Sequence, residues 1–387
     1  MSQQVLIPTH PERIHPLLGH HVAGLQADRS DWQDTIRRVI DNLVNIRDVD
    51  GSFLLRLEDG RVIDTKSWHG WEWTQGIGLY GLWKVWQMNG DAQTWSRMTD
   101  WFSARFAEGA PSRNINTVAP LLTLAHLYER SGEVSYRPWL ETWGQWVYDG
   151  LPRTEEGGFQ HIVYNSVNHQ QLWDDTLMMS VLPLAKIGRV LGRPHYGEEA
   201  KRQFMLHTKY LSDPATGLWF HGWTFDGRHH FARARWARGN AWVTIAIPEF
   251  IELLDLPASD ALRLFLVETL KAQVKALAPL QTPSGMWRTL LDDATSYEEA
   301  AATAGFAYGI LKGVRLGLLP AEYEAVGRRA ALAVREHINA AGELTQVSFG
   351  TPVFNTLQDY KDIPLTSMPY GQSMALLALV EFSYRFL

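Results

Sequence analysis

The chain contains no cysteine among its 387 residues. Disulfides, thiolate nucleophiles and cysteine-ligated metal sites are therefore excluded. It also lacks any run of 18 or more apolar residues, and its N-terminus has no basic segment followed by an apolar one. We therefore expect neither a membrane span nor a secretory signal, and we predict a cytoplasmic protein. The net charge is −6, with 36 Lys and Arg against 42 Asp and Glu, which argues against nucleic acid as a partner.

Tryptophan is the abundant residue type, with 17 copies. Otherwise the composition is ordinary for a globular protein, with 45% hydrophobic and 20% charged residues. Indole rings fill large cores and also form flat surfaces on which sugar rings stack. The tryptophan content therefore indicates a large core, a carbohydrate site, or both.

A loose repeat runs along the chain. Apolar stretches with helical periodicity begin with small or turn-forming residues, and their starts lie roughly 45 to 65 residues apart, enough for a helical hairpin and a loop. The six stretches are 76–86, 119–128, 176–184, 239–247, 304–311 and 371–380. More polar, amphipathic segments lie between them, at 92–107, 196–210, 258–278 and 321–340. Glycines followed by alternating apolar and polar residues recur in the connections, at Gly51, Gly157, Gly217, Gly285 and Gly342.

These patterns predict an all-α protein, an (α/α)6 barrel of six inner and six outer helices with short strands or extended loops in the connections. The alternative is an open helical solenoid, which would require polar terminal repeats. The last stretch, 371–387, is as apolar as the interior ones and favours the closed barrel. No linker divides the chain, so we expect a single catalytic domain over 31–387 preceded by an N-terminal extension over 1–30.

Polar residues at the starts of the inner helices should converge on one cavity. Asp175, in the run Trp173-Asp174-Asp175, is the candidate catalytic acid. Asp is a favoured helix cap, but Asp174 is available for that role and would leave Asp175 free. The helix terminus should lower the pKa of Asp175 and burial against Trp173 should raise it, and a general acid needs the second effect to dominate.

A basic segment precedes the fourth inner stretch. Its residue Arg238 lies between Trp236 and Trp242, and a guanidinium there could bind a substrate carboxylate with two hydrogen bonds. The two tryptophans could equally be core residues. His161 and His221 occupy equivalent places in two connections, which favours ligand contact. The pair at 229–230 has no carboxylate at metal-ligand spacing, so we expect no metal site, and no feature indicates a cofactor.

These motifs, in their order and spacing, resemble glycoside hydrolase family 105, the unsaturated rhamnogalacturonyl hydrolases, which are related to the unsaturated glucuronyl hydrolases. The resemblance runs from about Asp31 to Leu387. It implies a substrate made by a polysaccharide lyase, an oligosaccharide whose non-reducing uronic acid carries a C4=C5 double bond. It also implies that Asp175 is the proton donor and that Arg238 faces the uronate carboxylate. Substrate-binding positions implied or favoured in this way are Trp73, His161, Trp173, His221, Trp236 and Trp242.

The implied reaction is hydration of a vinyl ether. A proton is added at C4 and water at C5, and the hemiketal opens to expel the neighbouring sugar. One carboxyl group suffices in principle, whereas an ordinary glycosidase needs two. Many relatives have a second aspartate where this chain has Asn116, whose amide can bind a hydroxyl but cannot take a proton. The sequence therefore favours a mechanism with one acid.

Two other functions stay open. A sugar epimerase or isomerase could use the same barrel, with His161 and His221 moving the proton. A non-catalytic carbohydrate-binding protein would need the tryptophans but not Asp175.

Overall fold

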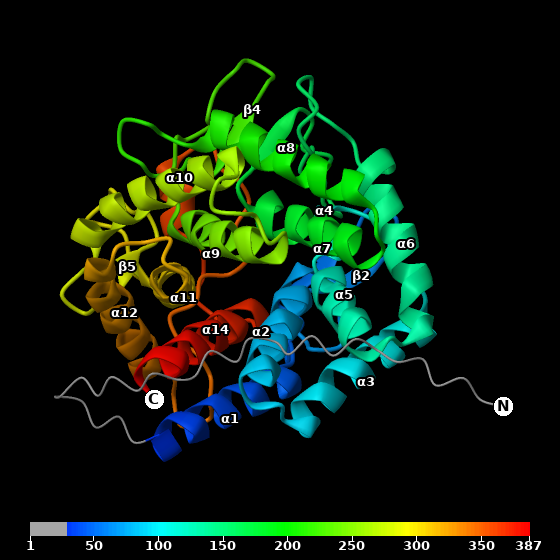
Figure 1. The fold of residues 1–387 in the computed structure, drawn as a ribbon, viewed down its shortest axis with the longest axis horizontal. Helices are drawn as coiled ribbons and strands as arrows, with labels where there is room; N and C mark the ends of the chain where they lie inside the picture. The colour runs from blue at the N-terminus through cyan, green and yellow to red at the C-terminus, as the bar shows by residue number, and fades with distance from the viewer. Residues whose placement is uncertain (1–28) are drawn as a thin grey trace.

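The computed structural model describes residues 29–387, and six of its helices form a closed inner ring (Figure 1). The inner helices are α2 (Trp73–Asn89), α5 (Pro120–Ser131), α7 (Leu182–Val190), α9 (Ala237–Leu253), α11 (Ala300–Arg315) and α14 (Pro369–Phe386), with a π-helical turn, η3 (Leu177–Val181), leading into α7. Each helix packs on the next, and α14 packs on α2. The ring is therefore closed, which confirms the predicted barrel and excludes the open solenoid.

A second layer of helices surrounds this ring (Figure 1). Within residues 29–387 it consists of α1 (Arg29–Asn45), α3 (Ala92–Glu108), α6 (Arg137–Gln145), α8 (Pro194–Leu211), α10 (Ala261–Leu277) and α12 (Glu324–Glu336). These helices bury one face only, whereas all but one residue of α9 are buried. The difference explains the two kinds of periodicity in the sequence, since an inner helix is covered on both sides.

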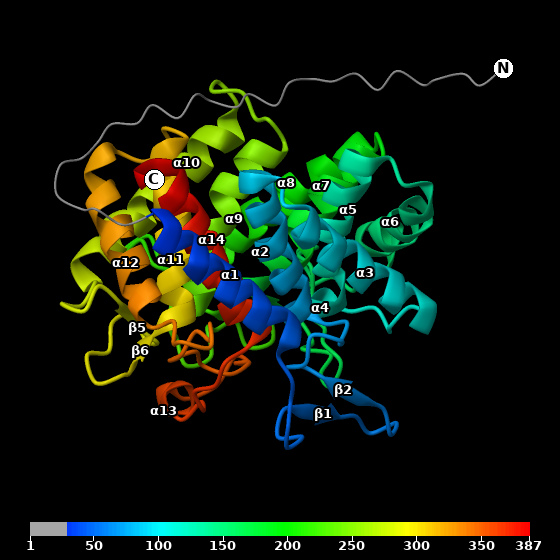
Figure 2. The ribbon, with the colours of Figure 1, turned by 90° about the horizontal axis from the view of Figure 1, so that it is seen from below.

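The connections gather at one end of the barrel. Figure 2 shows β1, β2, β5, β6 and the short helix α13 together at this end, opposite the C-terminus. The strands form antiparallel pairs: β1 (Leu54–Arg56) with β2 (Val62–Asp64), β3 (Gln171–Trp173) with β4 (Gly222–Thr224), and β5 (Trp287–Arg288) with β6 (Glu298–Glu299). The short helices α4 (Ile115–Val118) and α13 (Leu357–Lys361) and the helical turns η1 (Val134–Tyr136), η2 (Trp146–Gly150), η4 (Ala278–Leu280) and η5 (Ala321–Tyr323) complete the described elements. The extended connections predicted from the sequence are thus confirmed.

Glycines turn the chain at these connections. Gly157, Gly217 and Gly342 have φ angles of 82°, 85° and 78°, which other residues adopt only with strain. The segments that follow form single antiparallel bridges back to residues near the ends of the preceding outer elements, for example Trp219 to Ser212. The recurring glycine therefore marks the turn after which the chain runs back toward the next inner helix.

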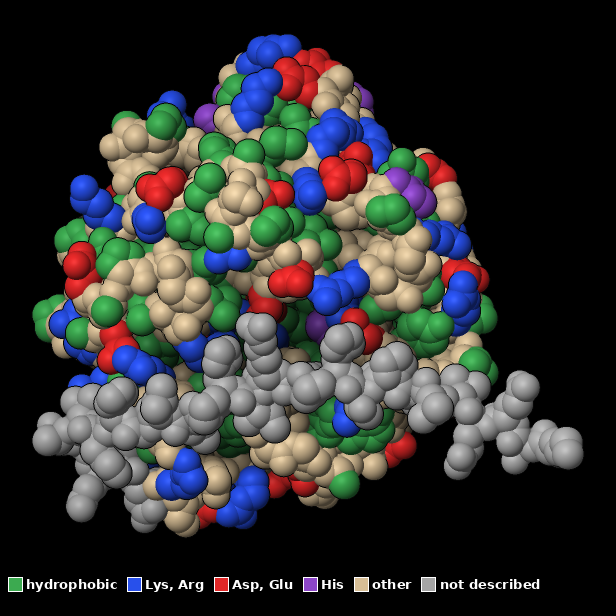
Figure 3. Space-filling model, viewed as in Figure 1, with side chains coloured by type: hydrophobic (Ala, Val, Ile, Leu, Met, Phe, Trp, Pro, Cys, Tyr) green, Lys and Arg blue, Asp and Glu red, His purple; other side chains and the backbone are tan. Residues whose placement is uncertain are grey.

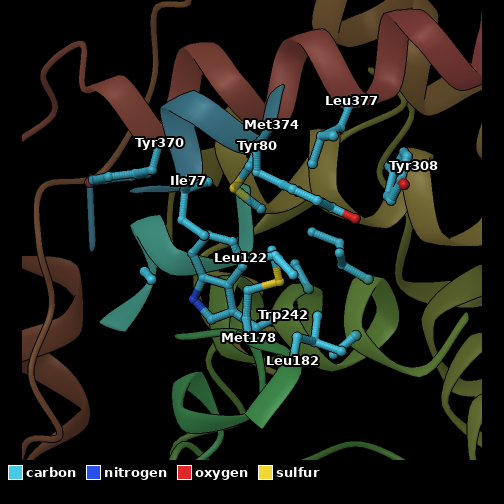
Figure 4. Close-up of a cluster of buried hydrophobic side chains, with 14 of the residues drawn as sticks. Ile77, Tyr80, Leu122, Met178, Leu182, Trp242, Tyr308, Tyr370, Met374 and Leu377 are labelled. Atoms are coloured by element: carbon cyan, nitrogen blue, oxygen red, sulfur yellow. The ribbon is translucent and has the colours of Figure 1, made fainter. Parts of the chain in front are cut away.

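Side chains from the inner helices fill the barrel axis (Figure 4). Ile77 of α2, Leu122 of α5, Trp242 of α9 and Met374 of α14 are each no more than 2% exposed and belong to one hydrophobic core. The core also holds charge, because the carboxylate of Glu249 is buried with two lysines and two tyrosines.

Within the described residues, no helix is long and apolar enough to cross a membrane. On the face seen in Figure 3, basic and acidic side chains are interspersed. The predicted N-terminal extension, 1–30, lies outside the described residues except for Arg29 and Ser30, which begin α1. The division of the chain at residue 30 therefore stays a prediction.

Candidate active site

A cavity of about 300 Å³ opens at the strand end of the barrel. It lies where the inner helices α2 and α7 begin, so side chains from distant parts of the sequence meet there. Its wall combines aromatic and polar groups, as ligand sites usually do. The lining residues come from five segments of the chain and three single positions. The segments contribute residues 52–55, residues 72–74, residues 161 and 163–165, residues 173, 175 and 179, and residues 349–352, and the single positions are Thr65, Asn116 and Met368.

Asp175 projects into this cavity directly after strand β3. Its side chain is 14% exposed, and its Oδ2 lies 3.2 Å from Nε2 of His221. The other ring nitrogen of His221, Nδ1, lies 2.8 Å from the hydroxyl of Tyr360. His221 is therefore held between a tyrosine and the candidate acid, which fixes the orientation of both groups.

The pKa of Asp175 is lowered, contrary to the expectation that burial against Trp173 would raise it. Burial does act to raise this pKa, but the hydrogen bond with His221 and the positive charge of Arg238 outweigh it. Asp175 is thus a carboxylate at neutral pH. An acid role requires that its pKa rise when an anionic substrate enters.

Asp174 does not cap the helix, which corrects a second expectation. It is fully buried, and its carboxyl group has the adjacent Asp175 as its hydrogen-bonding neighbour. The pKa of Asp174 is raised well above its usual value, first by burial and then by the charge of Asp175. It packs so closely on α9 that a Cβ at Gly239 would lie 2.3 Å from its Oδ2. Of the two adjacent carboxyls, Asp174 holds the proton.

Asp174, Asp175 and His221 also form the one described group whose donor atoms lie within 4.8 Å of one another and could hold a metal ion. The sequence spacing did not indicate this group. In the structure these groups bond to one another, because Nε2 of His221 lies against Asp175, and Nδ1 of His221 lies against the hydroxyl of Tyr360.

His161 and Trp173 form one wall of the cavity. Their rings stack with centroids 4.2 Å apart at an interplanar angle of 11°. Nδ1 of His161 lies 2.8 Å from the hydroxyl of Thr176, and burial lowers the pKa of His161 to about 3. The imidazole is therefore neutral, and the pair presents a flat, uncharged surface suited to a sugar ring.

Trp73 and Asn116 line the cavity as the sequence resemblance implied. Trp73 stacks on Tyr370 at 4.5 Å and meets the edge of Trp242 at 6.2 Å. Asn116 follows Asn114, whose side chain accepts the backbone N–H groups of residues 116 and 117 and caps α4. Because Asn114 serves as the cap, the amide of Asn116 is free to face the cavity.

Four predicted substrate-binding residues lie behind the wall instead. His221, Trp236, Arg238 and Trp242 are each no more than 1% exposed and do not line the cavity. Trp242 lies among the core side chains (Figure 4), where its ring contacts that of Trp73. In this arrangement a sugar ring therefore cannot stack directly on Trp236 or Trp242.

Arg238 holds the loop that forms part of the wall. Its guanidinium donates to the carbonyl and hydroxyl oxygens of Ser348 at 2.7 and 2.5 Å, to the carbonyl of Phe349 at 3.0 Å and to the hydroxyl of Thr351 at 3.2 Å. Glu299 lies 3.6 Å away and balances its charge. Most of the guanidinium donors are used by the loop, and the expected contact with a substrate carboxylate stays a prediction.

The sequence interpretation missed Glu72, Tyr164 and the segment 349–352, all of which line the cavity. A signal existed for Glu72 alone. It precedes Trp73 at the entry to an inner helix, as an acid beside an indole, and so repeats the arrangement of Asp175 after Trp173.

The model of Glycosyl Hydrolase Family 88 matches residues 45–386. The chain belongs to this family. It is 30% identical over 315 residues to the unsaturated rhamnogalacturonyl hydrolase YesR of Bacillus subtilis (strain 168), covering 80% of this chain and 89% of that one. The family membership makes the chain a glycoside hydrolase and favours hydrolysis over the epimerase and binding-protein alternatives.

Solved structures agree with this membership. A possible member of the GH105 family from Salmonella enterica serovar Paratyphi A is 56% identical, with a TM-score of 0.91 and coverage of 95% of this chain and 97% of that chain. A possible GH105 member from Klebsiella pneumoniae MGH 78578 is 53% identical, with a TM-score of 0.93 and full coverage of both chains. The resemblance drawn from the sequence motifs is thereby confirmed.

Proposed function

We propose that this family 88 enzyme releases the C4=C5 unsaturated uronic acid from the non-reducing end of lyase-generated oligosaccharides of the rhamnogalacturonan type. The observation that carries the proposal is Asp175, an ionised carboxylate inside an aromatic cavity and oriented by His221. The similarity to a rhamnogalacturonyl hydrolase over most of the chain supports the choice of substrate class.

In the proposed reaction the double bond of the uronate is hydrated. The anionic substrate raises the pKa of Asp175 by like-charge repulsion, so the residue can enter the reaction protonated. Asp175 gives this proton to C4, and its carboxylate then accepts a proton from the water that adds to C5. The hemiketal opens to a C5 ketone, and the bond to the neighbouring sugar breaks as that sugar takes up the remaining proton.

The other cavity residues position the ring. Trp73 and the stacked pair of Trp173 and His161 supply flat surfaces, and the amide of Asn116 binds a ring hydroxyl. Arg238 acts from behind the loop, where its positive charge already lowers the pKa of Asp175 and would likewise stabilise the uronate. A cytoplasmic location fits a small oligosaccharide substrate and stays a prediction from the sequence.

The test is incubation with lyase-generated disaccharides from pectic and from glucuronate-containing glycans. Loss of the ultraviolet absorbance of the conjugated acid, faster with the pectic substrate, is the expected result. The matched control is the same disaccharide after chemical saturation of its double bond. Equal cleavage of the saturated control, or no loss of absorbance with any substrate, would contradict the proposal.

A further inference from the structure

Glu72 places a second carboxyl group in the cavity, beside the residue that replaces the family's second aspartate. It lines the cavity at the entry to α2 and is only 3% exposed. Its Oε2 accepts the backbone N–H of Trp73 at 2.8 Å, and the side chain of Asn116 is its other hydrogen-bonding neighbour. The carboxyl and the amide therefore form one unit, built from the starts of two neighbouring helices.

A helix cap would explain the backbone contact of Glu72 but not its surroundings. Capping residues normally accept from the second or third residue of the helix, whereas Glu72 accepts from the first. This carboxyl is also enclosed with Asn116 in the substrate cavity. The arrangement points to a group that meets the ligand.

We propose that Glu72 is a second acid of the substrate site, which contacts the unsaturated uronate as a neutral hydrogen-bond donor and is held in place by Asn116 and the Trp73 amide. The inference rests on the proposed function, whose substrate is an anion. The mechanism with one proton donor that the sequence favours is left unchanged. Glu72 thus determines affinity for the uronate, and Asp175 retains the proton transfer.

The charge of the cavity supports a neutral Glu72. None of the described residues that line the cavity is Lys or Arg, and Asp175 is already ionised. A second carboxylate would repel an anionic sugar. Burial raises the pKa of Glu72 to about 8, although the bonds from Trp73 and Asn116 act to lower it. At neutral pH the group is therefore protonated and can donate to a substrate oxygen.

The neighbouring titratable groups do not obscure this ionisation. Tyr164, across the cavity, has a pKa raised to about 12, chiefly by burial and then by Glu72, and Arg61 beside it stays charged. On the opposite wall, the pKa of His161 is lowered to about 3 and that of Asp175 is also lowered. Before substrate binds, Glu72 is the described cavity residue that changes charge between about pH 7 and pH 9.

The experiment compares Michaelis constants for an unsaturated pectic disaccharide between about pH 6 and pH 9. In the wild type the constant should stay level to about pH 8 and then rise about tenfold per pH unit, as the neutral fraction falls. Glu72→Gln keeps a neutral donor of the same shape, so its constant should stay near the wild-type value and lose the alkaline rise. Glu72→Ala should raise the constant at every pH while changing turnover much less.

Glu58→Gln is the matched control, because Glu58 is exposed in the turn between β1 and β2 and does not line the cavity. It should reproduce the wild-type profile. Asn116→Ala should move the alkaline rise to higher pH, since loss of its hydrogen bond removes one influence that lowers the pKa of Glu72. Circular dichroism at each pH shows whether the variants are folded.

The outcomes separate the two proposals. A wild type that consumes no unsaturated disaccharide overturns the proposed function itself. An active wild type whose Michaelis constant is level through pH 9, or an alkaline rise that persists in Glu72→Gln, overturns the role of Glu72 alone. The wild-type profile decides the matter even where Glu72→Gln does not fold.

Discussion

Replacement of Asp175 by asparagine removes the proposed proton donor while preserving the shape of the site. The amide keeps an oxygen that can face Nε2 of His221, at the 3.2 Å separation of the native pair. It cannot give a proton to C4 or take one from water. Positioned acid–base groups contribute about 10²- to 10⁴-fold to rates, equivalent to about 3 to 5 kcal/mol of barrier. Turnover should therefore fall by that factor with little change in substrate affinity.

The assay for Asp175→Asn is the initial rate of ultraviolet absorbance loss, with affinity measured by calorimetry on the same preparation. Asp226→Asn is the control, because it makes the same change at a carboxylate whose side chain is 64% exposed and which lies outside the cavity lining. It should retain at least a tenth of wild-type turnover. If Asp175→Asn also retained more than a tenth, the assignment of the proton donor would be refuted.

Two further substitutions test the surroundings of the site. Arg238→Lys should raise the Michaelis constant about tenfold or more, because an ammonium cannot reproduce the planar set of contacts to Ser348, Phe349 and Thr351. Unchanged kinetics would show that neither the position of the loop nor the guanidinium of Arg238 matters for substrate binding. Glu249→Gln removes the carboxylate that pairs with buried Lys84 and one of the two that pair with buried Lys312, the other being Glu252. Urea titration should therefore show a loss of about 3 to 5 kcal/mol in unfolding free energy. A loss below about 1 kcal/mol would contradict the importance of this buried network.

The fold could be predicted because its signals are local and repeated. Apolar stretches at helical spacing, and a glycine that needs a positive φ before each return, recur along the chain. Closure of the ring follows once the first and last inner helices, α2 and α14, are equally apolar and pack on each other.

Site residues could be predicted where their position at the start of an inner helix decides whether the side chain faces the cavity. Trp73, Asn116, Trp173 and Asp175 lie at or near helix entries and do line the cavity. Arg238 lies at such an entry too, but a loop 110 residues further along the chain covers it. No local pattern encodes that contact.

The same limit applies to electrostatics. The lowered pKa of Asp175 depends on His221, which is 46 residues away in sequence. The neutral state of Glu72 depends on burial that only the assembled barrel creates. Residue type and spacing could nominate these groups, but their protonation follows from tertiary contacts.

The most direct test of vinyl-ether hydration is the fate of the solvent proton. The reaction is run in heavy water with an unsaturated disaccharide, and the uronate product is analysed by mass spectrometry and proton NMR. Product incubated alone in heavy water controls for exchange. Hydration predicts enzyme-dependent deuterium at C4, with Asn116→Ala slower but labelled at the same carbon. Release of the neighbouring sugar without deuterium at C4 would contradict the mechanism and indicate direct protonation of the glycosidic oxygen.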